Sequence, residues 1–494
     1  MGGAQGLNYV VGMLRVKIVA VLLGPSGVGL VGLYQSTLGL LGTVSGLGIG
    51  SSGVREVAQA EGRQDPALVA RTVLVLRRVC WATGLLGWAL AAAFALPLGR
   101  WAFGDADHAM AIAVLGVTLL FGAINGGQTA LLQGVRRIGD LARIQIAAML
   151  VNTAATIALY AWLRERGIVP VLVATAAISL GSSWWFARRV ILQPVALPWK
   201  DTWRDARRFA GLGLAFMWSG MLTAGLDMAT RAFITRTHGL EAAGHYQAAW
   251  ALSGMFAGFV LSAMGTDFYP RLTAVIVDRA AAARTVNEQT EIGILLALPG
   301  LLGTLAFAPW MLELFYSEKF RPAAALLPWF VLGVFGRVVS WPLGYIQVAM
   351  GASRWFAATE TVFLALCLGL VFGLVRTVGV VGTAYAFALS YFFYTLGMLW
   401  VAHALIDFRW SRAVQRLLGL TVVLVALGFG LTLVTHGWPA IAGGTALTSI
   451  AAFCSFRGLL SRLGPGHRIS KSIARIPIIC RFVPAEKRPN DPGD

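Results

Sequence analysis

Residues 15–35 read RVKIVAVLLGPSGVGLVGLYQ, a long apolar stretch that begins with two basic residues and is interrupted by Gly24 and Pro25. Comparable apolar runs recur along all 494 residues, and many are about 20 residues long, the length of helix that spans a bilayer core. The chain is 57% hydrophobic and 13% charged, whereas a soluble domain carries about 25% charged residues. The sequence therefore predicts an all-α polytopic membrane protein.

Hydropathy, together with the positions of charged, proline and glycine residues, predicts about fourteen transmembrane helices. Their approximate cores are 5–23, 28–50, 73–97, 109–132, 144–162, 169–187, 209–235, 243–267, 290–312, 322–348, 355–375, 379–402, 414–434 and 438–456. No basic residue precedes the first predicted span, 5–23, and Arg15 and Lys17 lie inside that span. We therefore expect this stretch to be a span and not a cleaved signal.

The loops on the two predicted sides of the membrane differ strongly in charge. With the N-terminus in the cytoplasm, 29 of the 40 Lys and Arg residues fall inside and seven fall outside. The positive-inside rule then places both termini in the cytoplasm. Attraction to anionic inner-leaflet lipids accounts for the formal charge of +18. Nucleic acid is not an expected partner, because no soluble segment is long enough for a basic binding module.

Gly48, Gly50 and Gly53 spell G-x-G-x-x-G, a pattern that indicates a dinucleotide site only between a strand and a helix. Here a glycine-rich span precedes the motif. Within that span Gly42, Gly46 and Gly50 form a small-residue face, which we expect to pack closely on another helix. The cysteines and histidines are scattered without metal-ligand spacing, so the sequence predicts no metal site and no cofactor.

A second segment, RAFITRTHGLEAAGHYQ at 231–247, repeats the spacing of the opening stretch. Gly24 and Gly29 are five residues apart, as are Gly239 and Gly244, with an offset of 215 between the pairs. The arginines that begin the two segments are offset by 216, and LLQGVRRIGD and YIQVAMGASR align at an offset of 214. We interpret this as a duplication of six spans in parallel orientation, with a site expected between the copies.

The duplication predicts two pseudo-symmetric six-helix lobes around a central cavity, with two extra C-terminal helices. The predicted segments are an N-terminal lobe at 1–192, a basic cytoplasmic linker at 193–208, a C-terminal lobe at 209–404, two additional transmembrane helices at 405–457, and a basic cytoplasmic tail at 458–494.

The stretches LLGPSGVGLVGLYQSTLGLLGTVSGLGIGSSGVREVAQA and AAGHYQAAWALSGMFAGFVLSAMGTDFYPRLTAV resemble segments of Wzx-type O-antigen and polysaccharide flippases. These flippases belong to the multidrug/oligosaccharidyl-lipid/polysaccharide exporter superfamily, and the resemblance covers roughly residues 5–404. It implies alternating access and a cargo of undecaprenyl-pyrophosphate-linked oligosaccharide, moved between the leaflets of the bacterial inner membrane. It also implies the polysaccharide polymerase machinery as a partner. A fourteen-helix arrangement occurs in lipid II flippases too, so that function is an alternative.

Four basic residues lie within predicted spans: Arg15, Lys17, Arg231 and Arg337. A charge at the bilayer centre costs at least ~2.5 kcal/mol, so we expect these side chains to face a cavity or a partner. Arg15 and Arg231 hold repeat-equivalent positions and are predicted to face the same space, where guanidinium groups would grip pyrophosphate oxygens. Lys17 projects from a different side of its helix than Arg15 and is alternatively a snorkelling residue.

Acidic residues in the spans offer other interpretations. Asp227 precedes Arg231 by four residues, so the two side chains are alternatively a simple neutralising pair. Asp227 and Glu360 are the candidates for ion coupling or charge balance. Arg337 lies close to Pro342, which we expect to break that span and free backbone groups.

Two other functions would place different demands on the sequence. A cation-coupled multidrug exporter of the same superfamily would need carboxylates in its cavity, whereas the mid-span charges here are mostly positive. A membrane glycosyltransferase or glycan polymerase would need positioned carboxylates on sizeable outer loops. Because the predicted outer loops are short, the sequence predicts that the protein is not an enzyme.

Overall fold

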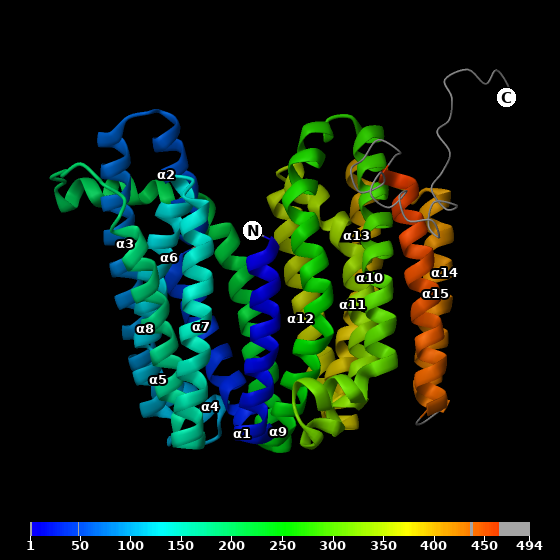
Figure 1. The fold of residues 1–494 in the computed structure, drawn as a ribbon. Coiled ribbons are helices and arrows are strands. Elements are labelled where there is room, and N and C mark those ends of the chain that lie inside the picture. Colours follow the sequence, from blue (N-terminus) through cyan, green and yellow to red (C-terminus); the bar gives the residue numbers. More distant parts are fainter. Residues whose placement is uncertain (1, 48, 435–437, 464–494) are drawn as a thin grey trace. The chain divides into compact units, whose positions relative to one another are not determined.

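A computed structural model describes residues 2–47, 49–434 and 438–463, and every regular element in these ranges is a helix (Figure 1). Nine helical segments of this described part are long and apolar enough to cross a membrane. Val11–Gly46 overlaps two of the predicted spans, and Ile138–Ala187 contains two. The prediction of an all-α polytopic membrane protein is confirmed. Most of the predicted basic tail lies outside the described residues.

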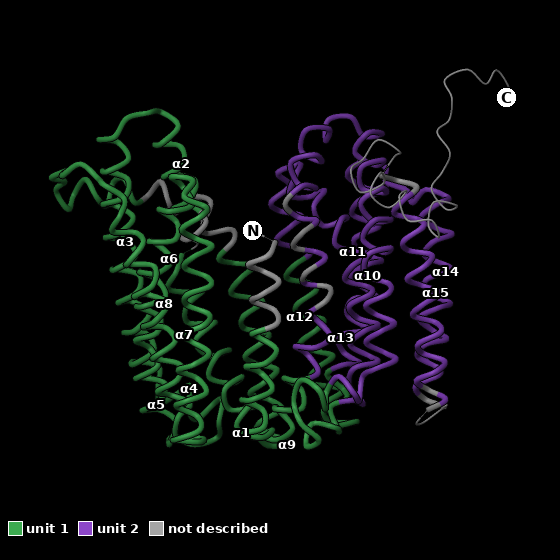
Figure 2. The backbone as a smooth tube through the Cα atoms, in the orientation of Figure 1, with its two compact units in different colours: residues 1–248, 312–323, 360–383 green, residues 249–311, 324–359, 384–494 purple. Residues whose placement is uncertain are grey.

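The chain divides into two compact units (Figure 2). Unit 1 comprises Met1–Ala248, Leu312–Ala323 and Glu360–Thr383, and unit 2 comprises Ala249–Met311, Ala324–Thr359 and Ala384–Asp494. The beginning of the predicted C-terminal lobe therefore belongs to unit 1, together with most of the predicted eleventh span.

Unit 1 is a bundle of helices that brings both copies of the repeat segment into one body. Its elements are α1 (Gly2–Gly46), α2 (Ile49–Gly62), α3 (Pro66–Ala93), α4 (Ala95–Ala102), α5 (Ala109–Leu115), α6 (Val117–Gly134), α7 (Ile138–Leu163), the 3₁₀ helix η1 (Arg164–Gly167), α8 (Ile168–Ala187), the first part of α9 (Trp199–Val275), most of the 3₁₀ helix η2 (Glu318–Ala325) and most of α12 (Ser353–Val378).

Capping and small residues explain how α3 begins and how it packs. The Asp65 carboxylate accepts hydrogen bonds from the backbone amides of Ala67 (2.9 Å) and Leu68 (3.1 Å), as expected of an N-cap residue. Further along α3, a Cβ on Gly84 would lie 2.9 Å from the Leu120 Cα. The missing side chain therefore lets α3 and α6 approach closely, as small residues do between membrane helices.

One end of unit 1, which we call the linker end, carries the segment predicted as a basic linker. Residues from Trp199 onward form the first turns of α9. Arg71 on α3 forms an ion pair with Asp205 at 2.8 Å. Arg78 donates to Thr202 Oγ1 (2.6 Å) and to the Leu197 carbonyl (2.8 Å). These bonds hold the segment against α3.

The opposite end of unit 1, which we call the η1 end, is formed by α4, η1 and the middle of α1. An apolar cluster there includes Leu23, Ile112, Tyr160 and Ile168. A second cluster brings α1, α4 and α9 together through Leu33, Ala102, Met228 and Ala232. This end corresponds to the predicted outer side of the membrane.

Unit 2 contains the second part of α9 and the remaining helices. These are most of α10 (Arg279–Phe315), α11 (Leu327–Ala349), α13 (Val381–Ile406), α14 (Arg412–Val434) and α15 (Trp438–Leu463). Its core includes Phe268, Val286, Leu343 and Ala402. The two extra C-terminal helices pack on α10, since a Cβ on Gly444 of α15 would lie 2.5 Å from the Ala306 Cβ.

Candidate functional site

Helices α1 and α9 break at repeat-related glycines. Gly24 has φ 67° and ψ −174° within α1, and Gly239 has φ 86° and ψ 173° within α9. Positive φ values of this kind favour glycine because a Cβ would be strained there. The two breaks lie 215 residues apart, which is the offset of the glycine pairs in the sequence repeat, so the matching geometry supports the duplication.

The two helices cross at the next pair of repeat-related glycines. A Cβ on Gly29 would clash with the Leu240 carbonyl oxygen, and one on Gly244 would clash with the Pro25 carbonyl oxygen. Leu240 follows the α9 break just as Pro25 follows the α1 break, so the contact is reciprocal. Backbone touches backbone here, which only residues without a side chain permit.

The expected close packing of the Gly42, Gly46 and Gly50 face is met at Gly42 and not at Gly46; the surroundings of Gly50 lie outside what the structure describes. A Cβ on Gly42 would meet only a Leu119 side-chain atom at 3.3 Å, and one on Gly46 would meet nothing within 4 Å. The spacing of small residues permits a close approach, but the neighbouring helices decide where the approach takes place. In this protein the approach of backbone to backbone lies at Gly29, one turn beyond the break.

Arg231 is buried beside the crossing, with 6% of its surface exposed. Its Nε and Nη2 atoms both donate to Gln247 Oε1, at 3.0 and 2.8 Å. Its Nη1 forms an ion pair with the Asp227 carboxylate and donates to the Asp227 carbonyl at 3.3 Å. The Tyr246 ring lies 5.6 Å from the guanidinium carbon. The structure thus forms the neutralising pair and adds a second partner, Gln247.

Arg15 lies in the first half of α1 and is partly buried. Within the described residues its guanidinium has no hydrogen bond and no ion pair; the phenol of Tyr160 on α7 lies within electrostatic range of it. An apolar stretch of α1 surrounds it, with Leu14 and Val16 as chain neighbours. Such a cation is expensive in a membrane unless a ligand or water pairs with it.

Lys17 has different contacts from Arg15, as expected from its position on another side of the helix. Its ammonium group donates to the backbone carbonyl oxygen of Glu313, near the end of α10. The Glu313 carboxylate forms an ion pair with Arg321 at 2.8 Å. Lys17 therefore joins α1 to the polar segment around η2 within unit 1.

Arg337 lies on α11 in unit 2 and is partly buried. The described part of the chain offers its guanidinium no hydrogen bond or ion pair. The expectation that Pro342 breaks the helix is wrong, because α11 runs through it without interruption from Leu327 to Ala349. Pro342 is buried within the helix, and membrane helices tolerate proline where neighbouring groups satisfy the backbone carbonyl that it frees.

Glu360, at the start of the α12 part of unit 1, accepts a hydrogen bond from the Ser219 hydroxyl of α9 at 3.3 Å. In this structure the carboxylate thus contacts α9, eight residues before Asp227. Both acidic candidates are therefore associated with α9: Asp227 belongs to it and Glu360 contacts it.

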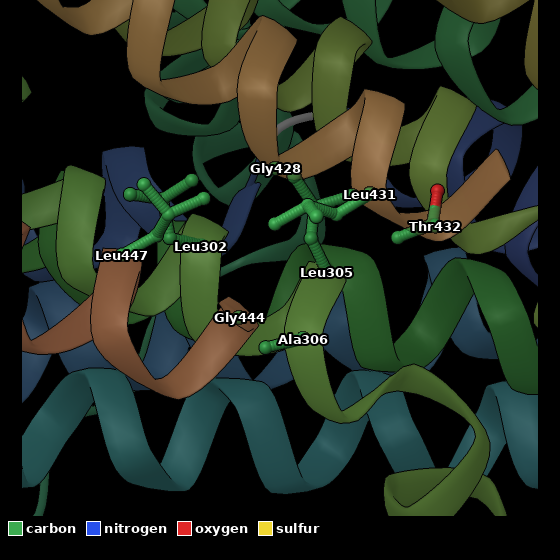
Figure 3. A pocket seen from close by; sticks show the side chains of 8 residues that line it. All are labelled: Leu302, Leu305, Ala306, Gly428, Leu431, Thr432, Gly444 and Leu447. Atoms are coloured by element: carbon green, nitrogen blue, oxygen red, sulfur yellow. The ribbon is translucent and has the colours of Figure 1, made fainter. Parts of the chain in front are cut away.

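Three cavities stand out in the described residues. A groove of about 910 Å³ runs between α3, α6 and α8, with Arg77 and Arg188 among its lining residues. A pocket of about 390 Å³ at the η1 end is lined by α4, α9 and α12. A third cavity, in unit 2 between α10, α14 and α15 (Figure 3), has about 20 Å³ of space, enough for roughly one water molecule.

Some features of the site had no clear sequence signal. Gln247 lies 16 residues beyond Arg231, on the far side of the α9 break, so helical periodicity does not connect the two. The Tyr-Gln pair that ends both repeat segments was the available hint. Among the described residues, no group of three His, Cys, Asp or Glu side chains is arranged to hold a metal ion.

Comparisons with known proteins match most of the chain. The sequence profile of the family described as "Polysaccharide biosynthesis protein" matches residues 1–276. Lipid III flippases from Escherichia coli (strain K12) and Shigella flexneri are each 22% identical over 396 residues, covering 78% of this chain and 92% of each relative.

Solved structures agree on the fold. A lipid II flippase, MurJ, in an inward closed conformation matches with a TM-score of 0.68 and 12% identity, over 93% of this chain and 99% of that one. An inward-facing multidrug resistance MATE family transporter of the MOP superfamily matches with a TM-score of 0.63 and 14% identity, over 81% of this chain and 95% of that one. At these identities the structural matches establish a shared fold.

Proposed function

Because the chain belongs to the polysaccharide biosynthesis protein family, we propose that it is a flippase for a lipid-linked oligosaccharide. Its cargo is an undecaprenyl-pyrophosphate-linked repeat unit of O-antigen or exopolysaccharide. The protein moves this cargo from the inner to the outer leaflet of the bacterial inner membrane by alternating access. Both termini are cytoplasmic, and the linker end of unit 1 faces the cytoplasm.

The observation that carries this proposal is the state of Arg15. It is a permanently charged side chain within an apolar helix, and no carboxylate of the described residues pairs with it. A planar guanidinium binds phosphate oxygens in pairs. A pyrophosphate group would supply the missing negative charge, while the lipid tail stays in the bilayer.

The other basic candidates have supporting roles in this proposal. Arg231 is held in a fixed orientation by Gln247, and it becomes available to phosphate when Asp227 moves away. Arg337 and Lys17 are further candidates for binding the cargo. Asp227 and Glu360 balance charge or couple transport to an ion.

Alternative cargoes make distinct predictions for deletion of the gene in its own bacterium. The proposal predicts loss of surface polysaccharide and accumulation of lipid-linked oligosaccharide. A lipid II flippase would instead be needed for cell-wall synthesis. A cation-coupled multidrug exporter, whose cationic cargo would suit Asp227 and Glu360, would change only sensitivity to cationic drugs.

Complementation of that deletion strain tests the role of Arg15. Loss of one charge-assisted contact weakens binding by about tenfold or more, so Arg15→Gln should restore at most about a tenth of wild-type glycan export. Arg15→Lys should restore an intermediate amount, because it keeps the charge but not the planar fork. Arg166→Gln, which removes an exposed arginine at the η1 end, is the matched control and should export normally. Full export by Arg15→Gln at equal protein level would refute the role.

A further inference from the structure

The pocket at the η1 end of unit 1 has walls from three separate elements. Trp101 comes from α4, Phe233, Arg236 and Thr237 come from α9, and Phe372 and Arg376 come from α12. The Phe233 and Phe372 rings pack edge to face with centroids 4.4 Å apart. The volume of about 390 Å³ falls within the usual range for small-ligand sites.

Two arginines converge on this pocket from helices that are far apart in sequence. Arg236 and Arg376 are both exposed, and in the described part of the chain neither has an ion pair. The Arg376 guanidinium lies 5.7 Å from the centre of the Phe233 ring, a cation–π arrangement that directs the group over the pocket wall. The pocket contains no carboxylate, so its charge is uniformly positive.

The position of these arginines is unusual for a membrane protein of this kind. Only seven of the 40 Lys and Arg residues fall on the predicted outer side, where the positive-inside rule disfavours them. Two of these seven line one small pocket. An anionic ligand would explain why positive charge is gathered here.

We propose that this pocket binds the phosphate headgroup of a lipid at the outer membrane surface. The two guanidinium groups contact phosphate oxygens, and the aromatic wall formed by Trp101, Phe233 and Phe372 contacts the first apolar carbons of the tail. The pocket is too small for an oligosaccharide together with its carrier, so it takes the headgroup alone. Two sources share this chemistry: the diphosphate of the transported carrier and the phosphate of an anionic phospholipid.

If the ligand is the diphosphate of the transported carrier, the inference rests on the proposed function. In that case the pocket receives the diphosphate after it leaves the cavity and keeps it from returning. A phospholipid source does not depend on transport, so binding is measured separately from glycan export.

Equilibrium binding to the purified full-length protein tests the proposal. The probes are radiolabelled farnesyl diphosphate, a short-chain polyprenyl diphosphate, and phosphatidylglycerol in mixed micelles. Arg236→Gln and Arg376→Gln should each weaken binding of at least one probe by about tenfold, and the double variant by about a hundredfold. A defect confined to farnesyl diphosphate identifies the carrier as the source, and a defect confined to phosphatidylglycerol identifies the phospholipid.

The double variant Arg164→Gln/Arg166→Gln is the matched control, because it removes two exposed charges at the same end outside the pocket. It should bind both probes like the wild type. A second readout is the rate at which a maleimide labels the Thr237→Cys variant. Bound lipid phosphate should slow this labelling. Undiminished binding by the Arg236→Gln/Arg376→Gln protein, or an equal loss in the control, would overturn the proposal. Either result would leave the flippase assay of Arg15→Gln unaffected.

Discussion

Arg15 on α1 and Arg231 on α9 occupy repeat-related positions, yet their surroundings differ. Arg231 is buried, ion-paired with Asp227 and hydrogen-bonded to Gln247. At the offset of 216 between the arginines, the residue that corresponds to Asp227 is Val11. Arg15 consequently lacks the acidic partner that Arg231 has one helical turn before it.

In the first copy, Gly32 of α1 lies beside the Gln247–Arg231 pair. A Cβ on Gly32 would lie 3.0 Å from the Gln247 Oε1 and 3.5 Å from the Arg231 Nε. The missing side chain in the first copy therefore makes room for the hydrogen-bonded pair of the second. The two copies thus share the backbone geometry but not the charges: Arg231 is satisfied within the protein, whereas Arg15 is the one that we propose binds the cargo.

The largest expected effect comes from breaking the feature that the two copies share. Gly244→Val should prevent stable folding, because the new side chain would clash with the backbone at Pro25, with an expected loss of more than about 3 kcal/mol. Thermal unfolding and size-exclusion profiles of the purified protein measure this. Gly39→Val introduces the same side chain on α1 where nothing lies within 4 Å, and it should remain folded. A normal melting temperature for Gly244→Val would disprove the backbone crossing.

A smaller loss of stability should follow removal of the internally satisfied arginine. Arg231→Met leaves Asp227 and Gln247 without their partner, and breaking such a pair destabilises by up to about 3 kcal/mol, reduced here by partial exposure of Asp227. The double variant Arg231→Met/Asp227→Leu should recover most of this loss, since an apolar replacement of a whole pair is often neutral. Melting temperatures of both variants check this. Additive losses in the double variant would show that the two side chains do not act as a pair.

The smallest change in stability is expected when Arg15 is given an acidic partner like Asp227, which pairs with Arg231. Val11→Asp recreates the i, i+4 spacing, and the attraction within such a pair amounts to only about 0.5 kcal/mol. Because the new carboxylate competes with phosphate, export should nevertheless fall several-fold. Val11→Asn has the same shape without the charge and should export normally. Equal export by the two variants would indicate that Arg15 does not bind an anion.

The general architecture followed from the sequence because a bilayer admits few solutions. Backbone groups in hydrocarbon must be satisfied internally, so long apolar runs had to be helices. Gly24 and Gly239, which the repeat aligns at an offset of 215, are also the positions where both helices break, because few residues other than glycine tolerate such φ values.

The sequence was a poor guide to which surfaces would meet. Gly42 and Gly46 satisfied the spacing rule for close packing, but Gly42 has a close neighbour whereas Gly46 has none within 4 Å. The Gln247–Arg231 contact forms only because α9 turns at Gly239, and the pocket with Arg236 and Arg376 joins helices 140 residues apart in sequence. Such contacts depend on tertiary packing, which local periodicity does not encode.

The most direct test of the central claim is the rate at which the purified protein moves undecaprenyl-pyrophosphate-linked oligosaccharide across proteoliposome membranes. Wild-type protein and Arg166→Gln should translocate at the same rate. Arg15→Gln, folded and inserted to the same extent, should translocate at no more than about a tenth of that rate. Equal rates for the wild type and Arg15→Gln would contradict the account, because the cargo's pyrophosphate would then have no need of the cation on α1.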